Sequence, residues 1–141
     1  MTPRPATTPT NIVIGVTKQA TALAACRRAF ELARATDAAV HLVYALAESD
    51  PKAEEVARSQ SEGLLESLRL SSSLPVTVHV EFGPAHEVIL DIAARVQADL
   101  IVIGNQGLVS HGRFTRLTPA RVLRGAKCSV LVVDTGDAVA H

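Results

Sequence analysis

A pair of glycines follows a short aliphatic segment in the last third of the chain. Residues 99–103 read Asp-Leu-Ile-Val-Ile, and Gly104-Asn-Gln-Gly107 comes directly after them. Because glycine has no side chain, a Gly-x-x-Gly segment at the end of a strand lets the backbone approach a ligand closely. The same spacing is typical of a plain turn that leaves a strand, so both interpretations stay open on spacing alone.

Four arginines follow the glycine pair, at positions 113, 116, 121 and 124. Cationic side chains and the first N–H groups of a helix both attract anions, and a helix is expected to start at Thr118. These groups could therefore hold phosphate oxygens. The alternative interpretation is a solvated loop and helix face.

The spacings that mark common catalytic and metal-binding motifs do not occur. There is no Gly-x-x-x-x-Gly-Lys-Ser/Thr phosphate loop, no Gly-x-Gly-x-x-Gly after the first expected strand, and no Gly-x-Ser-x-Gly. The positions of histidine and cysteine along the chain predict no metal site. We expect His86 and His111 to be exposed and without a role, although either could face a ligand.

Length and composition limit the fold and the partners. The 141 residues are expected to form one domain with a formal net charge of zero, which argues against nucleic acid or an anionic membrane as partner. Aromatic residues make up only 3% of the chain, so no row of rings is available to stack bases. No apolar run reaches the ~18 residues of a membrane span. We interpret Cys26 and Cys128 as buried thiols of a cytoplasmic protein.

Apolar periodicity predicts strands that alternate with helices. The expected strands are 11–16, 40–45, 75–81, 99–103 and 129–133. Their order along the chain implies one parallel five-stranded α/β sheet with helices on both faces and right-handed crossovers. Strict alternation of polar and apolar residues in 75–81 predicts an edge strand. The folded unit is expected at 11–134, with a disordered tail at 1–10 and a polar tail at 135–141.

Local signals predict where the four helices begin and end. The first helix is expected to end near Thr36-Asp37, and Asp50-Pro51 and Gly83-Pro84 are expected to open the second and third. Thr118 is expected to cap the fourth helix, with Pro119 at its first position and Gly125 at its end. The side chains expected on the buried side of the second helix are Val56, Leu64 and Leu68.

Two segments of the last third resemble the carboxyl-terminal half of a universal stress protein domain. They are residues 98–107, Ala-Asp-Leu-Ile-Val-Ile-Gly-Asn-Gln-Gly, and residues 121–133, Arg-Val-Leu-Arg-Gly-Ala-Lys-Cys-Ser-Val-Leu-Val-Val. Gly83-Pro84 with Glu87-Val-Ile fits the entry of that family into its third helix, and the likeness spans about residues 11–134. The resemblance implies a Rossmann-like fold of the adenine nucleotide alpha hydrolase-like kind, with strand order 3-2-1-4-5.

The resemblance also implies a nucleotide site between the first and fourth strands. Many members of the family bind ATP there through the motif Gly-x2-Gly-x9-Gly-Ser/Thr, and Gly104 and Gly107 match its first half. The second half does not match: counting nine residues reaches Leu117-Thr118, and alignment on Arg121 reaches Arg116-Leu117. The site residues that the resemblance implies are Thr17, Ala45, Gly104, Gly107, Arg116 and Thr118.

Departures from the family motif predict weakened binding. A missing glycine puts a side chain where phosphate would lie, and Thr17 stands where the family has an aspartate that holds ribose or phosphate. Each loss costs on the order of 1–3 kcal/mol, which together is roughly thirtyfold to ten-thousandfold in affinity. The resemblance thus implies a regulatory domain of the stress response with a partly degraded site for ATP, AMP or another adenine nucleotide.

Two other functions stay open. The first is a homodimeric interaction module that binds no nucleotide, because the last strand (129–133) is an apolar edge strand and in the family often joins two copies. The second is a weak ATPase or nucleotidyl transferase on a related fold. The sequence shows no nucleophile–base pair and no metal cluster, so it predicts that the protein is not an enzyme.

Overall fold

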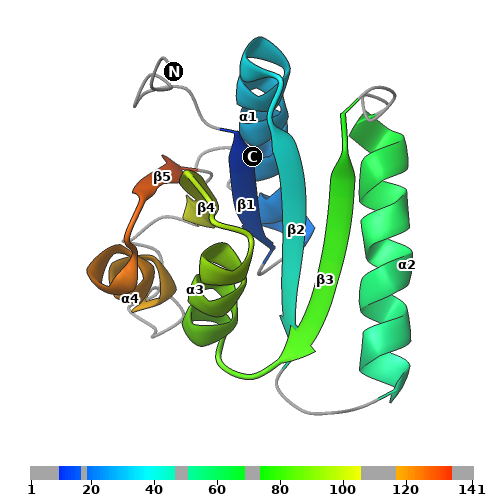
Figure 1. Ribbon diagram of the computed structural model, residues 1–141. Coiled ribbons are helices and arrows are strands. Elements are labelled where there is room, and N and C mark those ends of the chain that lie inside the picture. Colours follow the sequence, from blue (N-terminus) through cyan, green and yellow to red (C-terminus); the bar gives the residue numbers. More distant parts are fainter. Residues whose placement is uncertain (1–9, 17–18, 47–50, 69–73, 106–116, 135–141) are drawn as a thin grey trace.

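The computed structural model describes residues 10–16, 19–46, 51–68, 74–105 and 117–134. In this part of the chain the strands form one parallel sheet in the order β3-β2-β1-β4-β5, as predicted (Figure 1). The strands are β1 (Asn11–Val16), β2 (Ala39–Leu46), β3 (Val76–Phe82), β4 (Leu100–Asn105) and β5 (Ser129–Asp134). The helices are α1 (Gln19–Thr36), α2 (Pro51–Leu68), α3 (Ala85–Arg95) and α4 (Leu117–Gly125).

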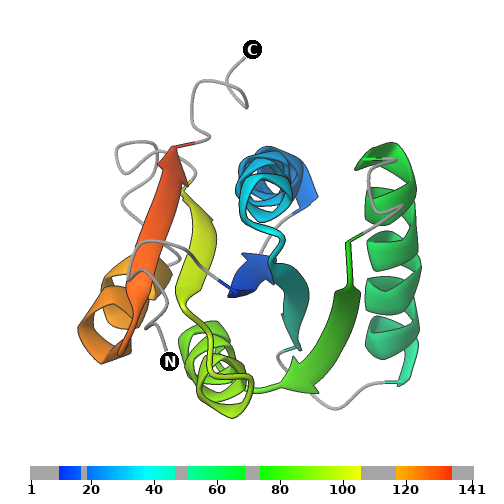
Figure 2. The ribbon, with the colours of Figure 1, turned by 45° about the horizontal axis from the view of Figure 1, so that its top comes forward.

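The helices form two layers, one on each face of the sheet. Helices α1 and α2 cover one face, and α3 and α4 cover the other (Figure 2). This division follows from the strand order, because the chain steps in one direction from β1 to β3 and in the opposite direction from β3 to β5. Right-handed crossovers then place the first two helices and the last two on opposite faces.

The core has one cluster on each face of the sheet. On one face, Phe30 of α1 packs in a cluster with Ile12, Ile14 and Leu42 of the sheet, and all four are fully buried. On the other face, beneath α3 and α4, Ile89 and Ile92 of α3 pack with the buried side chains of Val13, Ile101 and Ile103 of the sheet. Strand β1 is thus covered on both faces, as its unbroken apolar sequence predicts. Each such side chain contributes about 1.5–3 kcal/mol by leaving water.

Helix α3 approaches the central strand closely at Gly15. A Cβ atom there would lie 2.6 Å from Ile89 Cδ1 and 3.0 Å from Ile103 Cγ2. A side chain at this position would force the side chain of Ile89 to move, so the glycine lets Ile89 of α3 pack directly on the carboxyl-terminal part of β1.

One prediction about the buried side of α2 is wrong. Val56 is 54% exposed, whereas Ala57 is buried at 4% exposure. Adjacent helical residues point about 100° apart, and α2 packs on β2 and β3 through the side that carries Ala57. The predicted start of this helix at Pro51 is confirmed. The side chains of Leu64 and Leu68 lie outside the described part.

Several element boundaries differ from the prediction by one or two residues, among them those of β4 and α4. Strand β4 runs through Gly104 to Asn105, because β5 continues beside it and pairs Gly104 with Val133. Helix α4 begins at Leu117, so Thr118 lies in its first turn and not at its cap, while Gly125 ends the helix as predicted. The predicted edge position of β3 is confirmed.

Candidate functional site at the carboxyl edge of the sheet

Strands β1, β2 and β4 end side by side at one edge of the sheet. Val16, the last residue of β1, pairs with Tyr44 of β2, and the register of β1 with β4 puts Gly104 at the same level. Ala45 lies one residue further along β2. The chain leaves β1 toward one face and enters β4 from the other, so these strand ends form the switch point at which open parallel sheets bind ligands.

The structure brings two of the predicted site residues to this edge. Ala45 is partly buried against the core cluster under α3, and Gly104 is partly exposed in the last part of β4. They stand on either side of β1. Ala45 has a small side chain and Gly104 has none, so neither places a bulky group beside the end of the central strand.

The other predicted site residues stay predictions. Thr17, Gly107 and Arg116 lie outside the described residues, and so does His111. Thr118 belongs to the first turn of α4, and its side chain is also outside the described part. The side chains of Arg121 and Arg124, two of the four arginines of this region, are exposed on α4.

Helix α3 begins at the same edge, directly after β3. The chain turns at Gly83, whose φ of 140° suits glycine, and Pro84 then takes the N-cap position without a side-chain hydrogen bond. The prediction that His86 is exposed is wrong: its side chain is only 21% exposed, because the turn brings the first turn of α3 back onto the sheet. His86 Nε2 lies 3.9 Å from Glu87 Oε2.

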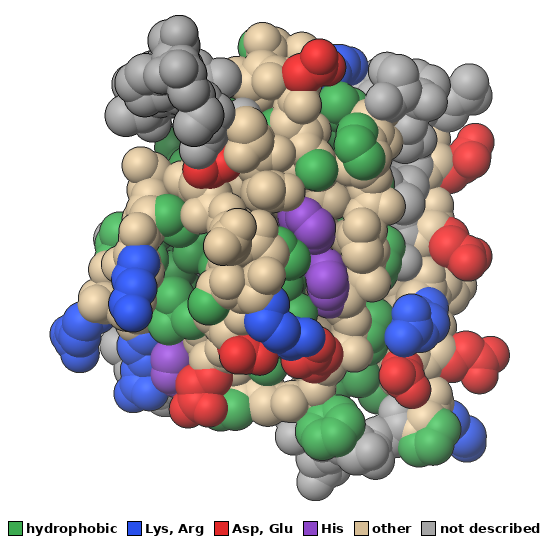
Figure 3. Space-filling model, in the orientation of Figure 1, with side chains coloured by type: hydrophobic (Ala, Val, Ile, Leu, Met, Phe, Trp, Pro, Cys, Tyr) green, Lys and Arg blue, Asp and Glu red, His purple; other side chains and the backbone are tan. Residues whose placement is uncertain are grey.

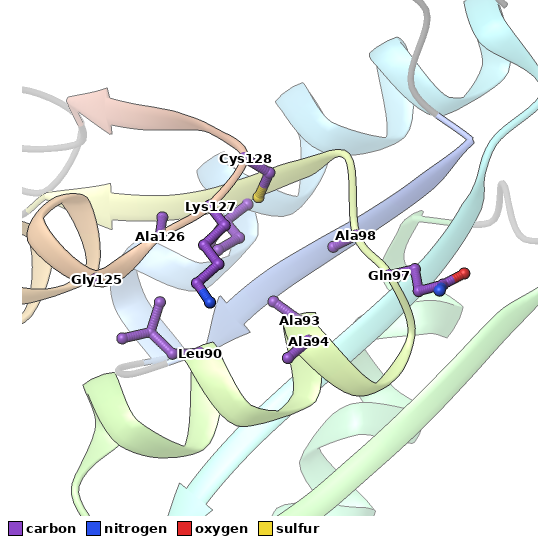
Figure 4. A pocket seen from close by; sticks show the side chains of 10 residues that line it. Leu90, Ala93, Ala94, Gln97, Ala98, Gly125, Ala126, Lys127 and Cys128 are labelled. Carbon is purple, nitrogen blue, oxygen red and sulfur yellow. The ribbon is translucent and has the colours of Figure 1, made fainter.

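A pocket of about 230 Å³ lies at the opposite edge, between the end of α3 and the turn from α4 to β5 (Figure 4). Burial, together with the nearby Asp99 carboxylate, raises the pKa of the Cys128 thiol, so this thiol is not activated as a nucleophile. Neither Ala45 nor Gly104, the predicted site residues described at the other edge, lines this pocket. Its lining residues are mostly small: Leu90, Ala93, Ala94, Gln97, Ala98, Ile101, Gly125, Ala126, Lys127 and Cys128.

Both cysteines are free of disulfide bonds, and they differ in burial. Cys26 is fully buried in α1, as predicted, and burial raises the pKa of its thiol to about 12. Cys128 is only partly buried. Burial, with a smaller contribution from Cys26, also raises the pKa of Tyr44 to about 12, so this phenol at the end of β2 stays protonated at neutral pH.

A histidine pair, His41 of β2 and His79 of β3, was missed by the search for motifs along the sequence. His41 Nδ1 lies 3.1 Å from His79 Nε2, and His41 Nε2 lies 3.3 Å from Asn11 Oδ1. The two rings adjoin on the face of the sheet that also carries α3 (Figure 3). His79 belongs to the polar face of β3, whereas His41 shares its face of β2 with the apolar Val43 and Ala45. The pair can be recognised only once the pairing of β2 with β3 is known.

Among the described residues, no group of three or more histidine, cysteine, aspartate or glutamate side chains is placed to hold a metal ion. None of the described helices is long and apolar enough to cross a membrane. The described groups at the carboxyl edge include the backbone around the ends of β1, β2 and β4, the small side chain of Ala45, the phenol of Tyr44 and the imidazole of His86.

The model of the universal stress protein family matches residues 9–134. The chain belongs to the universal stress protein family. The match covers every described strand and helix, and it extends over the carboxyl edge with Ala45 and Gly104. The resemblance noted in the last third of the sequence is thereby confirmed for nearly the whole chain.

Solved structures share the fold of this universal stress protein domain. A universal stress protein in complex with cAMP matches with a TM-score of 0.74 and 22% identity, over 90% of this chain and 98% of that one. A universal stress protein from Archaeoglobus fulgidus in complex with dAMP gives 0.69 and 21%, over 88% and 96%. The universal stress protein UspA from Lactobacillus plantarum gives 0.64 and 24%, over 88% and 97%.

Proposed function

We propose that this universal stress protein domain is a regulatory domain of the stress response that binds an adenine nucleotide where β1 and β4 part. The observation that carries the proposal is the position of Gly104 beside the end of β1, with Ala45 on the other side. Open parallel sheets bind ligands at this kind of switch point. Structural neighbours in complex with cAMP and dAMP support an adenine nucleotide as the ligand class.

The direction of the helices supports an anionic ligand at this edge. Helix α3 begins beyond the carboxyl end of β3, and α1 and α4 begin after β1 and β4 in the chain. Helix N-termini carry partial positive charge and N–H groups without intrahelical partners. In this proposal the base lies near Ala45, the phosphates lie near Gly104, Gly107, Arg116 and Thr118, and the hydroxyl of Thr17 faces the ribose.

The test is calorimetric titration of the full chain with ATP, ADP, AMP and cAMP, each with and without Mg²⁺. We expect one of them to bind with a dissociation constant in the micromolar range, weaker than a complete motif would give because Thr17 offers no carboxylate. Absence of heat with all four at millimolar concentration would contradict nucleotide binding and favour the interaction module.

Two glycine variants locate the site. Gly107→Arg fills the position of close approach and should abolish the binding of whichever nucleotide gives heat. Gly63→Arg is the matched control, since Gly63 lies exposed in α2 and a Cβ atom there meets nothing within 4 Å. Unchanged affinity in Gly107→Arg would show that the glycine pair does not form the site.

We also propose that β5 joins two copies of the chain. Among the described strands none pairs with the outer side of β5, and its four residues from Val130 to Val133 are all apolar. A soluble protein normally covers such an edge. Light scattering of the full chain should give twice the mass of the monomer, and a monomeric result would contradict this proposal.

The folded unit that we propose comprises residues 11–134 in a cytoplasmic protein, with tails at 1–10 and 135–141. We propose that it acts by binding and not by catalysis. Release of phosphate from ATP above the blank, lost in Gly104→Val, would contradict this and favour the ATPase alternative.

A further inference from the structure

The histidine pair (His41 and His79) links the two outermost strands on one side of the sheet. Strand β3 is an edge strand, with β2 as its only neighbour in the sheet. The ring contact is diagonal, because His79 pairs in register with Val43 and not with His41. The ring centroids are 5.3 Å apart, and the two nitrogens are separated by 3.1 Å. The contact is therefore a nitrogen-to-nitrogen hydrogen bond, nearly in line with both rings.

The neighbour on β1 fixes which nitrogens carry protons. Asn11 Oδ1 is an acceptor, so His41 Nε2 must donate to it across 3.3 Å. In a neutral ring the other nitrogen of His41, Nδ1, then carries a lone pair. His79 Nε2 must donate to that lone pair. The three side chains thus form one directed chain from β3 through β2 to β1.

We propose that the histidine pair is a proton-sensitive contact, which holds β3 to β2 with no or one added proton and opens when a second proton binds. With one proton, the cationic ring donates to the lone pair of the neutral ring, and the hydrogen bond becomes charge-assisted. With two protons, both facing nitrogens carry hydrogen, no acceptor remains between them, and two positive charges stand within a single ring contact.

Charged groups around the pair come from two elements. Glu81 of β3 and Arg95 of α3 form an ion pair of 2.6 Å, and Arg95 also contacts Asp91 of α3 at 3.1 Å. The other face of β2 is apolar core. No further ionisable side chain is identified among the described residues as acting on either ring. Because Glu81 is already paired with Arg95, no carboxylate among the described residues is paired with the histidine rings when the second proton binds.

The directions of the pKa shifts agree with this geometry. Burial lowers the pKa of His41, and the nearby His79 lowers it further. Burial also lowers the pKa of His79, with a further decrease from Arg95 and an opposing increase from Glu81. Both rings are consequently neutral at pH 7, and the two protons enter in coupled steps as the pH falls below 6.5.

The first experiment is an NMR titration of the full chain between pH 8 and pH 4.5, which follows the ring C–H signals of His41 and His79. We expect each ring to sense both protonation steps, with midpoints separated by more than about one pH unit. His79→Gln keeps a donor toward His41 Nδ1 but removes one proton site. In this variant His41 should titrate in a single step. Two independent single-step curves in the parent protein would overturn the proposal.

The second experiment measures whether the contact holds β3. Amide hydrogen exchange is compared between the β2–β3 and β4–β5 pairs at pH 7.5 and at a pH below the second midpoint found in the NMR titration, after correction for the intrinsic exchange rate. Both pairs join an edge strand to its neighbour, but β4 and β5 contain no histidine. We expect protection to fall at least tenfold more for β2–β3 than for β4–β5, and this difference should disappear in His41→Gln/His79→Gln. Equal changes in the two pairs of the parent protein would overturn the proposal independently of nucleotide binding.

Discussion

The two edge strands of this sheet, β3 and β5, differ in how their side chains protect the strand edge against pairing with another chain. Strand β3 alternates strictly, with valines toward the core under α1 and polar residues on the opposite face, where Thr77 is exposed. Strand β5 is apolar at four successive positions, and its side chains pack into both core clusters. Helix α4 contacts β5 on one face and α1 contacts it on the other.

The two edges therefore differ in their protection against pairing with another chain. On the polar face of β3, His79 and Glu81 have partners within the protein, through the histidine pair and the ion pair of Glu81 with Arg95. Alternation, together with charged side chains, is a common protection of an edge against pairing with another chain. Strand β5 lacks that protection, which is why we assign it to the interface between two copies. The variants below test this contrast.

The largest effect is expected from a charge placed on β5. Val132 is partly buried in the cluster under α4, so Val132→Lys should lower the free energy of unfolding by about 2–3 kcal/mol and convert the proposed dimer to a monomer. Light scattering and urea unfolding at one protein concentration measure both changes.

Thr77→Lys is the matched control on β3, because Thr77 is exposed in the polar face of the opposite edge. It should change the free energy of unfolding by no more than about 0.5 kcal/mol and leave the mass unchanged. If the two lysine variants had the same effect on mass, the assignment of β5 as the interface would be wrong.

Much of the fold could be predicted because apolar periodicity records burial directly. The apolar stripe of α3, with Val88, Ile89 and Ile92, is buried, and β1, whose sequence is apolar throughout, is covered on both faces. Val56 was misplaced because hydrophobicity alone favours a valine over the neighbouring alanine when the buried side of a helix is chosen, although the two side chains point about 100° apart. The structure buries Ala57, because the helix lies close to the sheet there.

The candidate site could be predicted only in part. The position of Gly104 follows from a strand that ends in glycine, and that of Ala45 from the family resemblance. The histidine pair could not be found from spacing, since residues 41 and 79 are far apart in the chain and meet only through the pairing of β2 with β3. Long-range pairing of polar side chains is set by register, which short motifs do not contain.

A smaller loss of stability, which both edges of the sheet should share, is expected from Asp99→Ala. Asp99 Oδ2 accepts hydrogen bonds from Thr10 N at 2.6 Å, Thr10 Oγ1 at 2.7 Å and Asn11 N at 3.0 Å, and so ties the start of β1 to the start of β4. Its loss should cost about 1–2 kcal/mol in urea unfolding. Because β1 and β4 are central, hydrogen exchange should rise in parallel at β2–β3 and β4–β5. A rise confined to one edge would show that the two edges are not coupled through the centre.

The smallest effects are expected when one partner of the ion pair beside His79 is replaced. Replacing Glu81 and replacing Arg95 should shift the pKa of His79 in opposite directions. Arg95 lowers the pKa of His79 and Glu81 raises it. Glu81→Gln should therefore lower this pKa further, and Arg95→Gln should raise it toward the ordinary value of 6.5. A histidine whose pKa is depressed in the folded state binds fewer protons than in the unfolded chain, so stability is complete above pH 6.5 and falls with the pH until the folded-state pKa is reached.

The acid-induced loss of stability should consequently be larger in Glu81→Gln and smaller in Arg95→Gln than in the parent protein. Urea unfolding at pH 7.5 and pH 5 measures it, and the value at pH 7.5 serves as the reference for each variant, which removes the direct cost of breaking the ion pair. The same two measurements on Thr77→Lys report the effect of a new positive charge on the polar face of β3. If Glu81→Gln and Arg95→Gln changed the acid-induced loss of stability in the same direction, these two charges would not set the pKa of His79 as proposed. The proposal that β5 joins two copies does not depend on this result.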